Sequence, residues 1–306
     1  MKIPDIHIET LVAELHSLRD CVRWAISQFN ARGLFFGHST NNALDEAVNL
    51  VLYALHLPHD IPEDLWSSRL TTEEKLVVFN LLKQRIEKRL PLNYLTHQAW
   101  FAGFEFYVDK RVLVPRSPLA ELIENGFEPW LNSESIERVL ELGTGSGCIA
   151  IATALHLPDA RVDAVDISDD AIEVARFNVD KYNLDEQVNI LKGDLFSGLK
   201  DITYNLVISN PPYVDAQELA DMPHEYHHEP VLGLAAGKDG LDIVRRILRD
   251  AFQFLTPEGV LIVEVGASQP ALMDAYPDVP FLWLEFANGG EGVFLLTAEQ
   301  LKEYEF

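Results

Sequence analysis

From residue 138 onward the sequence alternates short apolar segments with amphipathic ones, and this alternation restricts the possible folds more than any other feature. The predicted strands are Arg138–Leu142, Arg161–Asp166, Val188–Lys192, Tyr204–Ser209 and Val260–Val265. Three helices are predicted between these strands. The first ends at Leu157, the second begins after a Ser168 cap and ends at about Tyr182, and the third covers Gly240–Leu255. Strands separated by helices pair in parallel, and the helices cover both faces of the sheet. We therefore expect an α/β domain with a mostly parallel sheet.

Two later features complete this pattern. Phe281–Phe286 and Val293–Thr297 are joined by Ala287-Asn288-Gly289-Gly290, which predicts a terminal hairpin at an antiparallel edge of the sheet. Residues 214–239 form a long connection of mixed composition after the fourth predicted strand. Long connections in compact domains tend to carry function.

The first 90 residues have a helical period instead. Apolar residues recur every three or four positions from Leu11 to Phe29, which predicts one helical face, and again over Asn41–His56. Thr71 and Glu74 offer a capping box before a helical pattern at Leu76–Leu90. This part is expected to be a small helical domain.

Between the two patterns the period changes to two. Phe104, Phe106 and Val108 alternate with other residues, and Asp109-Lys110 offers a turn, which predicts a β-hairpin over Trp100–Val114. The expected organisation is therefore a helical domain, a hairpin linker and an α/β domain, over residues 1–95, 96–118 and 119–306.

Three alternating glycines follow the first predicted strand. Gly143, Gly145 and Gly147 let the backbone turn sharply and let a ligand approach without meeting a Cβ. The N–H groups at the start of the next helix favour an electron-rich ligand group. The dinucleotide fingerprint would have its third glycine at position 148, where this chain has Cys148. The form found here, preceded by Glu141, resembles the first motif of S-adenosylmethionine-dependent methyltransferases; a tight turn without a ligand is the alternative.

That resemblance implies cofactor contacts along the whole loop, from Glu141, Gly143, Thr144, Gly145, Ser146 and Gly147. Two carboxylates at the next strand ends add to them. Asp166 can accept hydrogen bonds from both ribose hydroxyls. In methyltransferases a carboxylate at the place of Asp194 accepts from the adenine amino group, with Leu195 and Phe196 beside the ring; a turn cap is the alternative for Asp194.

The fourth predicted strand runs into Asn210-Pro211-Pro212-Tyr213. Ligands of open α/β sheets lie beyond the carboxyl ends of the strands, so this segment and the glycine loop are expected to face one crevice. Consecutive prolines make the segment stiff. The side-chain oxygen of Asn210 and the carbonyl of Pro211 can both accept from a planar –NH2 group, and Tyr213 can stack on it. A rigid turn without chemistry is the alternative.

Together the motifs resemble the amino-group methyltransferases, which modify exocyclic nitrogens of adenine, cytosine or glutamine. Over residues 8–300 the chain is similar to the protein-glutamine N5-methyltransferase family, through Tyr94-Leu95, Phe104–Asp109 and Arg111–Arg116. The resemblance implies a doubly wound, seven-stranded Rossmann-like methyltransferase domain beside the helical domain, which should recognise the substrate protein. It also implies methyl transfer from S-adenosylmethionine to a glutamine side-chain amide, with S-adenosylhomocysteine as the product. The implied catalytic residues are Asn210, Pro211 and Tyr213. The implied substrate contacts come from these three and Pro212, and Asn210 also lines the cofactor site.

The family's substrate branches differ after the hairpin. Release-factor enzymes typically read Pro-Arg-Pro-Glu-Thr-Glu, whereas this chain has Pro115-Arg116-Ser117-Pro118-Leu119-Ala120-Glu121. With Trp100-Phe101, this sequence is similar to the branch that methylates a glutamine of large-subunit (50S) ribosomal protein L-three. A release factor is the alternative substrate. A nucleic-acid adenine N6-methyltransferase and a non-catalytic assembly factor are the alternative functions.

Charge supports a basic protein as the partner. Residues 1–110 carry 11 basic and 14 acidic side chains, and residues 111–306 carry 13 basic and 34 acidic, so the net charges are −3 and −21. An acidic surface repels nucleic acid, whose binding rests on Lys and Arg, and steers a basic partner toward it. Direct nucleic-acid binding is therefore not expected. General solubility is the alternative explanation of the acidity.

The remaining features predict a cytoplasmic protein without a metal site. No run of about 18 uncharged apolar residues occurs, and the first residues lack the pattern of a secretory signal. His224, His227 and His228 are expected to be polar loop residues rather than metal ligands.

Two further side-chain groups receive a structural interpretation. Cys148 is expected to be a buried packing residue rather than a nucleophile. Arg85, Lys88 and Arg89 are expected to form a solvated helix end, with an RNA-binding patch as the alternative.

Overall fold

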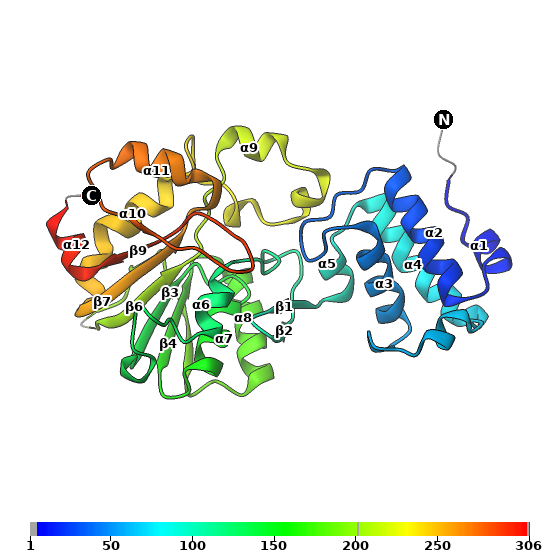
Figure 1. Ribbon diagram of the computed structural model, residues 1–306, viewed down its shortest axis with the longest axis horizontal. Helices are drawn as coiled ribbons and strands as arrows, with labels where there is room; N and C mark the ends of the chain where they lie inside the picture. Colours follow the sequence, from blue (N-terminus) through cyan, green and yellow to red (C-terminus); the bar gives the residue numbers. More distant parts are fainter. Residues whose placement is uncertain (1–4, 201, 305) are drawn as a thin grey trace. The chain divides into compact units, whose positions relative to one another are not determined.

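The chain forms two compact units in a computed structural model that describes residues 5–200, 202–304 and 306 (Figure 1). We call the chain up to Gln98 together with Pro223–His228 the helical unit. Ala99–Met222 together with Glu229–Phe306 is called the sheet unit. The hairpin thus belongs to the sheet unit, and part of the long connection after the fourth predicted strand belongs to the helical unit.

Helices build the helical unit around one core. They are α1 Ile8–Glu14, α2 Leu18–Ala31, α3 Ala43–Ala54, α4 Thr72–Lys88 and α5 Leu92–Thr96, with the 3-10 turns η1 Glu63–Ser67 and η3 His224–His228. Apolar faces of α2, α3 and α4 pack together, with Phe29, Leu50 and Phe79 fully buried between them. Thr71 and Glu74 form the predicted capping box of α4.

The prediction of one helical face over Leu11–Phe29 is wrong, because two helices share this segment. The side chain of Ser17 accepts from the Asp20 N–H at 3.2 Å, and the Asp20 carboxylate accepts from the Ser17 N–H at 2.9 Å. This reciprocal capping box starts α2 as a new helix. Apolar residues of both helices pack on the same core, so their spacing does not mark the break.

Within the described chain, seven strands form one sheet in the order β5-β4-β3-β6-β7-β9-β8. The strands are β3 Arg138–Leu142, β4 Arg161–Asp166, β5 Val188–Lys192, β6 Tyr204–Ser209, β7 Leu255–Glu264, β8 Leu282–Trp283 and β9 Val293–Thr297. Strands β3 to β7 are parallel, and β9 is antiparallel to both β7 and β8. The chain moves outward from β3 to β5 and then crosses back to β6, so β3 and β6 flank the topological switch point, where such sheets bind ligands. The predicted fold class and terminal hairpin are confirmed.

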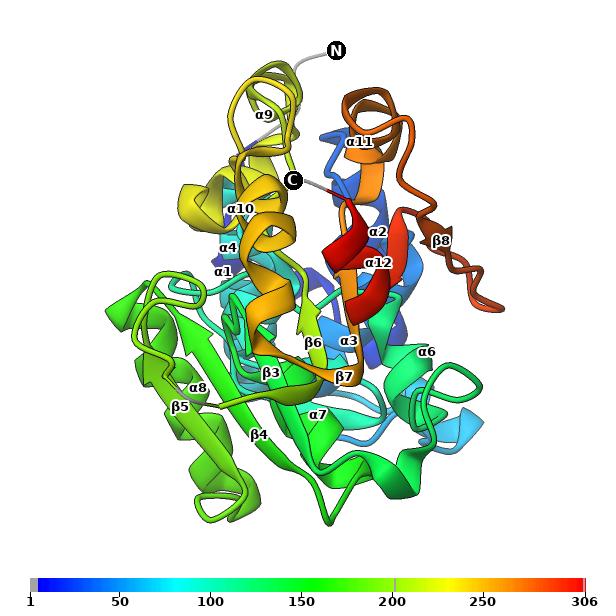
Figure 2. The ribbon, with the colours of Figure 1, turned by 90° about the vertical axis from the view of Figure 1, so that its left-hand side faces the viewer.

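Helices cover both faces of this sheet (Figure 2). The first face carries α6 Leu119–Glu124, α7 Cys148–His156 and α8 Asp169–Tyr182, and the second carries α10 Asp242–Ala251, α11 Gln269–Ala275 and α12 Ala298–Glu303. The short elements α9 Ala216–Asp221, η2 Ser133–Ser135, η4 Val231–Gly233, η5 Phe252–Phe254 and η6 Gly266–Ser268 lie in the connections. Alternate residues of β3 enter opposite cores: Val139 packs on the first face, and Leu140 and Leu142 pack on the second. In the described part of the chain, no helix is both long and apolar enough to cross a membrane.

The hairpin lies earlier in the chain than its sequence predicts. Its strands are β1 Ala99–Phe101 and β2 Phe104–Phe106, which pair antiparallel across Ala102-Gly103. Both turn residues have a positive φ, of 46° and 80°, as a two-residue hairpin turn requires. The predicted turn at Asp109-Lys110 is present, since the Val112 N–H donates to the Asp109 carbonyl at 3.0 Å, but it lies after β2 and not between the two hairpin strands.

Asn178 joins three parts of the sheet unit. Its side chain is fully buried in α8, accepts from the Tyr107 N–H at 2.8 Å and donates to the Tyr107 carbonyl at 2.9 Å. It also donates to the Ser146 carbonyl at 2.9 Å. One amide therefore fixes both the segment after the hairpin and the glycine loop.

Asn178→Ala is expected to lower the free energy of unfolding by at least about 3 kcal/mol, because three backbone groups lose their partner and each costs about 1–3 kcal/mol when left unsatisfied. Urea unfolding measures this change. The control is Asn125→Ala, which removes an exposed hydrogen bond to the Glu121 carbonyl and should change stability by less than about 0.5 kcal/mol. Equal effects of the two variants would contradict this role of Asn178.

Candidate functional site

The ends of β3 and β6 bring the two sequence motifs together. Leu142 and Ser209 are paired residues at the carboxyl ends of these adjacent parallel strands. The Ser209 hydroxyl also donates to the Leu142 carbonyl at 2.8 Å. Gly143 and Asn210 therefore leave the sheet from neighbouring positions, at the switch point where ligands bind.

The glycine loop is shaped by its backbone. The N–H groups of Gly143 and Thr144 both donate to the Val165 carbonyl on β4, at 2.8 and 3.1 Å. Gly143, Gly145 and Gly147 all have positive φ, a conformation that other residues rarely adopt. A Cβ added at Gly147 would lie 3.3 Å from Ala175 of α8, so this glycine also permits close helix packing. A Cβ at Gly143 or Gly145 would meet nothing within 4 Å, so open space remains beside the backbone for a ligand.

The buried side chain of Glu141 stabilises the glycine loop through hydrogen bonds. Its side chain is 1% exposed and accepts from the Thr144 hydroxyl at 2.6 Å and from the Ala150 N–H at 3.0 Å. Burial raises the pKa of Glu141 to about 8, and the nearby Asp166 charge adds to the rise. In this arrangement Glu141 holds the turn and the start of α7, and any contact with a cofactor stays a prediction.

Asp166 lies where β4 ends beside the loop. Its two carboxylate oxygens accept from the Gly145 N–H and the Ser168 N–H, both at 2.9 Å. Burial raises the pKa of Asp166, while these backbone hydrogen bonds oppose the rise. Each oxygen keeps a second lone pair, so a ligand can still be accepted there.

The third strand end is less open than the sequence suggests. Asp194 forms an ion pair with Arg246 of α10 at 2.8 Å, and both side chains are partly exposed. Leu195 is partly buried against the core beneath α10. Phe196 is buried and stacks on Phe254 with ring centroids 4.7 Å apart, which places it in that core.

The Asn-Pro-Pro-Tyr segment has one free polar side chain and one fixed aromatic ring. Among the residues that the structure describes, Asn210 has no hydrogen-bond partner for its side chain, and this half-buried amide can serve a ligand. Pro211 is buried and Pro212 half-buried. The Tyr213 hydroxyl donates to Glu264 at 3.0 Å, and its carbonyl accepts from the Ser268 hydroxyl at 2.7 Å.

Close backbone approach holds Tyr213 in place. A Cβ added at Gly266 would lie 2.6 Å from its ring, and one at Gly240 would lie 2.3 Å from its carbonyl oxygen. Gly240 belongs to the Gly-Lys-Asp-Gly-Leu segment that closes the long connection. The ring is therefore clamped at a defined position beside Asn210.

Sequence reasoning missed Glu264, which organises this part of the site. It is 3% exposed at the carboxyl end of β7 and accepts from Tyr213 and, at 2.5 Å, from the Ser117 hydroxyl. Burial raises the pKa of Glu264 to about 7, against the opposing hydrogen bonds and the Arg116 charge. A charged residue within the apolar segment at 260–265 was the available signal. Ser117 belongs to the segment that distinguishes this chain from the release-factor branch.

The return of the long connection is fixed in the same way. Glu229 is 3% exposed and accepts two hydrogen bonds of 2.7 Å from the Arg116 guanidinium. It also accepts from the Val114 N–H at 3.0 Å. Bidentate guanidinium–carboxylate pairs fix orientation as well as distance.

Three other predictions can be compared with the structure. Cys148 is buried, and burial raises the pKa of its thiol to about 12, as suits a packing residue. The described residues contain no group of three or more His, Cys, Asp or Glu side chains placed to hold a metal ion. The solvated helix end is wrong for Arg85, which is 1% exposed and paired with the buried Glu46 and Glu225.

A glycine loop beside an Asn-Pro-Pro-Tyr segment at the switch point is the arrangement of a Rossmann-like methyltransferase. The family model "Methyltransferase small domain" matches residues 127–225, which include both motifs. A methyltransferase structure from Pyrococcus furiosus is 16% identical, with a TM-score of 0.46 over 75% of this chain and 99% of that one.

Two relatives that match nearly the whole chain show which methyltransferase family it belongs to. The ribosomal protein uL3 glutamine methyltransferase of Francisella tularensis is 50% identical over 97% of this chain and 95% of its own length. The protein of the same name from Neisseria gonorrhoeae is 50% identical over 94% of this chain and 96% of its own. The chain belongs to the ribosomal protein uL3 glutamine methyltransferase family, which confirms the predicted branch.

The raised pKa of Glu264 predicts how Glu264→Gln changes stability with pH. The folded chain favours the protonated carboxyl, so its stabilising contribution is complete below the ordinary pKa of 4.5 and is lost as the pH rises to about 7. Relative to the parent, the variant should therefore gain about 3 kcal/mol of unfolding free energy between pH 4 and about pH 8. Urea unfolding at both pH values, with the exposed Glu124→Gln as control, measures this gain. A difference between variant and parent that does not change with pH would refute it.

Proposed function

We propose that this chain transfers a methyl group from S-adenosylmethionine to the side-chain amide nitrogen of a glutamine in ribosomal protein uL3. The observation that carries the proposal is the pairing of Leu142 with Ser209, which starts the glycine loop and Asn210 from adjacent positions. One motif suits the cofactor and the other suits a planar amide. The names of the full-length relatives support the choice of substrate.

The residues at the strand ends fit the cofactor. The open space beside Gly143 and Gly145 admits a ligand against the backbone, and Asp166 offers acceptors for ribose hydroxyls. When bound, S-adenosylmethionine supplies an electrophilic methyl group and departs as neutral S-adenosylhomocysteine. Asp194 can take the adenine amino group where its exposed pairing with Arg246 leaves a lone pair available.

The attacking amide nitrogen must be oriented and stabilised by the protein. An amide nitrogen is a poor nucleophile because its lone pair is delocalised into the carbonyl. Asn210 and the carbonyl of Pro211 accept the two N–H groups, aim the nitrogen at the methyl group and favour its developing tetrahedral geometry. Tyr213, held by Glu264, lies against the amide plane. The proton can leave after transfer, so the chain contributes positioning and electrostatic stabilisation rather than a strong base.

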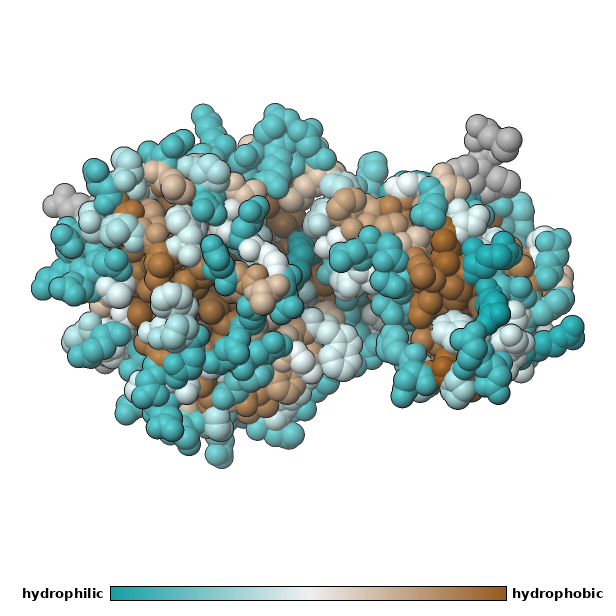
Figure 3. Space-filling model, in the orientation of Figure 1, coloured by the Kyte–Doolittle hydropathy of each residue, from teal (hydrophilic) through white to brown (hydrophobic). Residues whose placement is uncertain are grey.

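Charge supports a basic protein substrate. Residues 111–306 carry a net charge of −21, and hydrophilic residues dominate the visible rim of the sheet unit (Figure 3). Complementary charge accelerates encounter and suppresses wrong partners. A nucleic-acid substrate would instead need clustered Lys and Arg side chains along its path.

The test is methylation of purified proteins. The chain is incubated with labelled S-adenosylmethionine and either ribosomal protein uL3 or a peptide chain release factor, and the modified residue is located by mass spectrometry. The proposal expects one methylated glutamine in uL3. Labelling of the release factor alone would overturn the substrate, and binding of the cofactor without transfer to either protein would overturn the activity.

Asn210→Ala should lower the rate of methyl transfer about 10²- to 10³-fold, by analogy with the loss of one oxyanion-hole donor, while leaving cofactor affinity nearly unchanged. Asn210 acts on the orientation of the nucleophile, which matters most in the transition state. Asn210→Asp keeps an acceptor but adds a charge, so its rate should lie between those of Ala and the parent. Parental turnover by both variants would make Asn210 a turn residue.

Asp166→Ala should weaken S-adenosylmethionine binding about 10- to 150-fold, which corresponds to a charge-assisted hydrogen bond of about 1.5–3 kcal/mol. Calorimetry measures the affinity. Because Asp166 also accepts from two backbone N–H groups, thermal unfolding is recorded in parallel. The exposed Asp170→Ala removes the same charge nearby and should bind as the parent does. Unchanged affinity in Asp166→Ala would remove this residue from the site.

A further inference from the structure

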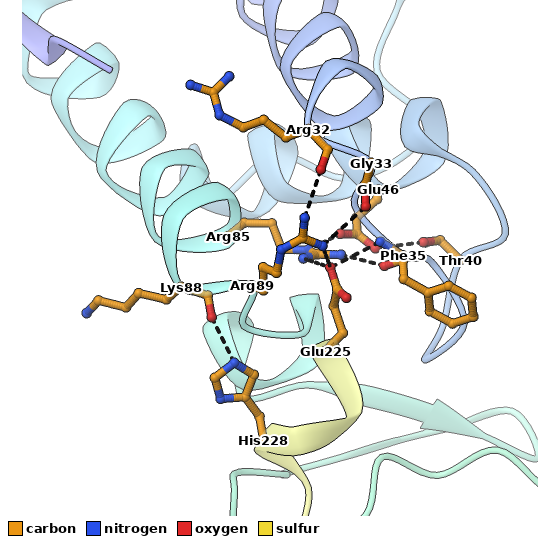
Figure 4. Close-up of polar contacts among 10 residues, drawn as sticks. All are labelled: Arg32, Gly33, Phe35, Thr40, Glu46, Arg85, Lys88, Arg89, Glu225 and His228. Carbon is orange, nitrogen blue, oxygen red and sulfur yellow. Dashed lines mark hydrogen bonds and ion pairs between the residues drawn. The ribbon is translucent and has the colours of Figure 1, made fainter. Parts of the chain in front are cut away.

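Buried charges gather in the helical unit around Glu225 (Figure 4). The Glu225 side chain is fully buried, and its Oε1 accepts from the Phe35 N–H at 3.1 Å, Arg85 at 3.3 Å and Arg89 at 3.1 Å. Arg85 is 1% exposed, pairs also with Glu46 of α3, and donates to the Phe35 carbonyl at 2.7 Å. Glu225 is therefore the point at which η3 is fixed to α4 and to the loop after α2.

The balance of charge makes this attachment strong. Burial alone would raise the pKa of Glu225, but the Phe35 N–H and the charges of Arg85 and Arg89 hold it below its ordinary value. The carboxylate thus stays ionised, and its withdrawal would leave Arg85 short of a partner in the interior. Two neighbouring contacts add to the attachment. The rings of Tyr226 and Phe35 pack with their centroids 5.6 Å apart, and Nε2 of His228 forms a hydrogen bond of 2.8 Å with the Lys88 carbonyl oxygen.

This attached segment lies in the middle of the connection that follows the Asn-Pro-Pro-Tyr motif. In the sheet unit, the Val214 N–H donates to the Leu234 carbonyl and the Ala236 N–H donates to the Val214 carbonyl, both at 2.9 Å. The outgoing and returning ends of the connection therefore lie side by side directly after Tyr213. The chain between them reaches Pro223–His228, which belongs to the helical unit.

We propose that Glu225 is a positioning residue for methyl transfer, because its buried attachment in the helical unit restrains the connection that begins at Tyr213. This inference rests on the proposed function. Glu225 touches no reacting group and acts through the chain that leads to Asn210–Tyr213. The helical unit then contributes to turnover.

Glu46 provides a matched control. It is 4% exposed, pairs with the same Arg85 and accepts from the Thr40 hydroxyl at 2.9 Å, but it lies on α3 and not on the connection. If the charges only stabilise the helical unit, Glu46→Gln and Glu225→Gln should have similar effects. If Glu225 restrains the connection, only its own substitution should slow the chemical step.

The experiment compares parent, Glu225→Gln and Glu46→Gln as full chains with ribosomal protein uL3 as substrate. Glu225→Gln should lower kcat by at least about 10-fold and by up to about 100-fold, the cost that a misplacement of about 1 Å can reach. Its KM and cofactor affinity should stay within about twofold of the parent, as for a loss confined to the transition state. Glu46→Gln should keep the parental kcat. Equal losses of kcat in both variants, or an increase in KM alone, would overturn the proposal.

Hydrogen exchange gives a readout that needs no substrate. Amides of residues 214–222 should exchange faster in Glu225→Gln than in the parent and Glu46→Gln, and unchanged exchange would overturn the proposal. If the parent does not methylate uL3, the proposed function fails, while the exchange comparison still decides whether Glu225 restrains the connection. Should Glu225→Gln not fold, Arg89→Lys weakens the same attachment from its 29% exposed side and is judged by the same two measurements.

Discussion

The adjacency of β3 and β6 is the constraint on which the rest of the site depends. Leu142 and Ser209 are 67 residues apart in sequence, yet their strands pair in register up to the last residue of each. The Ser209 hydroxyl satisfies the Leu142 carbonyl just where the chain leaves the sheet. Once this edge exists, the glycine loop and Asn210 have no independent freedom to separate. The remaining contacts refine an arrangement that the sheet topology has already set.

Local hydrophobic patterns predicted where most strands of the sheet begin and end. Strands β3, β4, β5 and β6 begin and end at the predicted residues, because continuous or alternating apolar residues are bounded by glycine and polar residues. Strand β7 begins at Leu255, earlier than predicted, since its first residues include exposed polar ones. The hairpin was predicted too late in the chain because its turn uses Ala102 with a positive φ, a conformation that alanine rarely adopts.

Long-range pairing explains what the sequence did not reveal. Glu225 meets Arg85 across 140 residues, and Glu264 meets Ser117 across 147, so no spacing rule connects them. Part of the signal was nonetheless present. Arg85 continues the helical spacing of Val78 and Leu82, which are both buried. Its position on that face indicates a buried cation, which needs a carboxylate partner. The Asn210 and Gly143 assignments needed only strand order, which is why sequence reasoning could bring them together.

Under the proposed function, the acidity of the chain has two separate roles. Glu141, Glu225 and Glu229 are buried and each accepts a backbone N–H, so they fix the course of the glycine loop and of the long connection. Glu264 is also buried and fixes a tyrosine ring. These four buried carboxylates are a small part of the 34 acidic side chains of residues 111–306. Salt screens exposed charges over about 10 Å at 0.1 M but affects buried pairs far less. Under the proposed function, ionic strength consequently acts on the attraction of a basic substrate protein and leaves the geometry of the site in place.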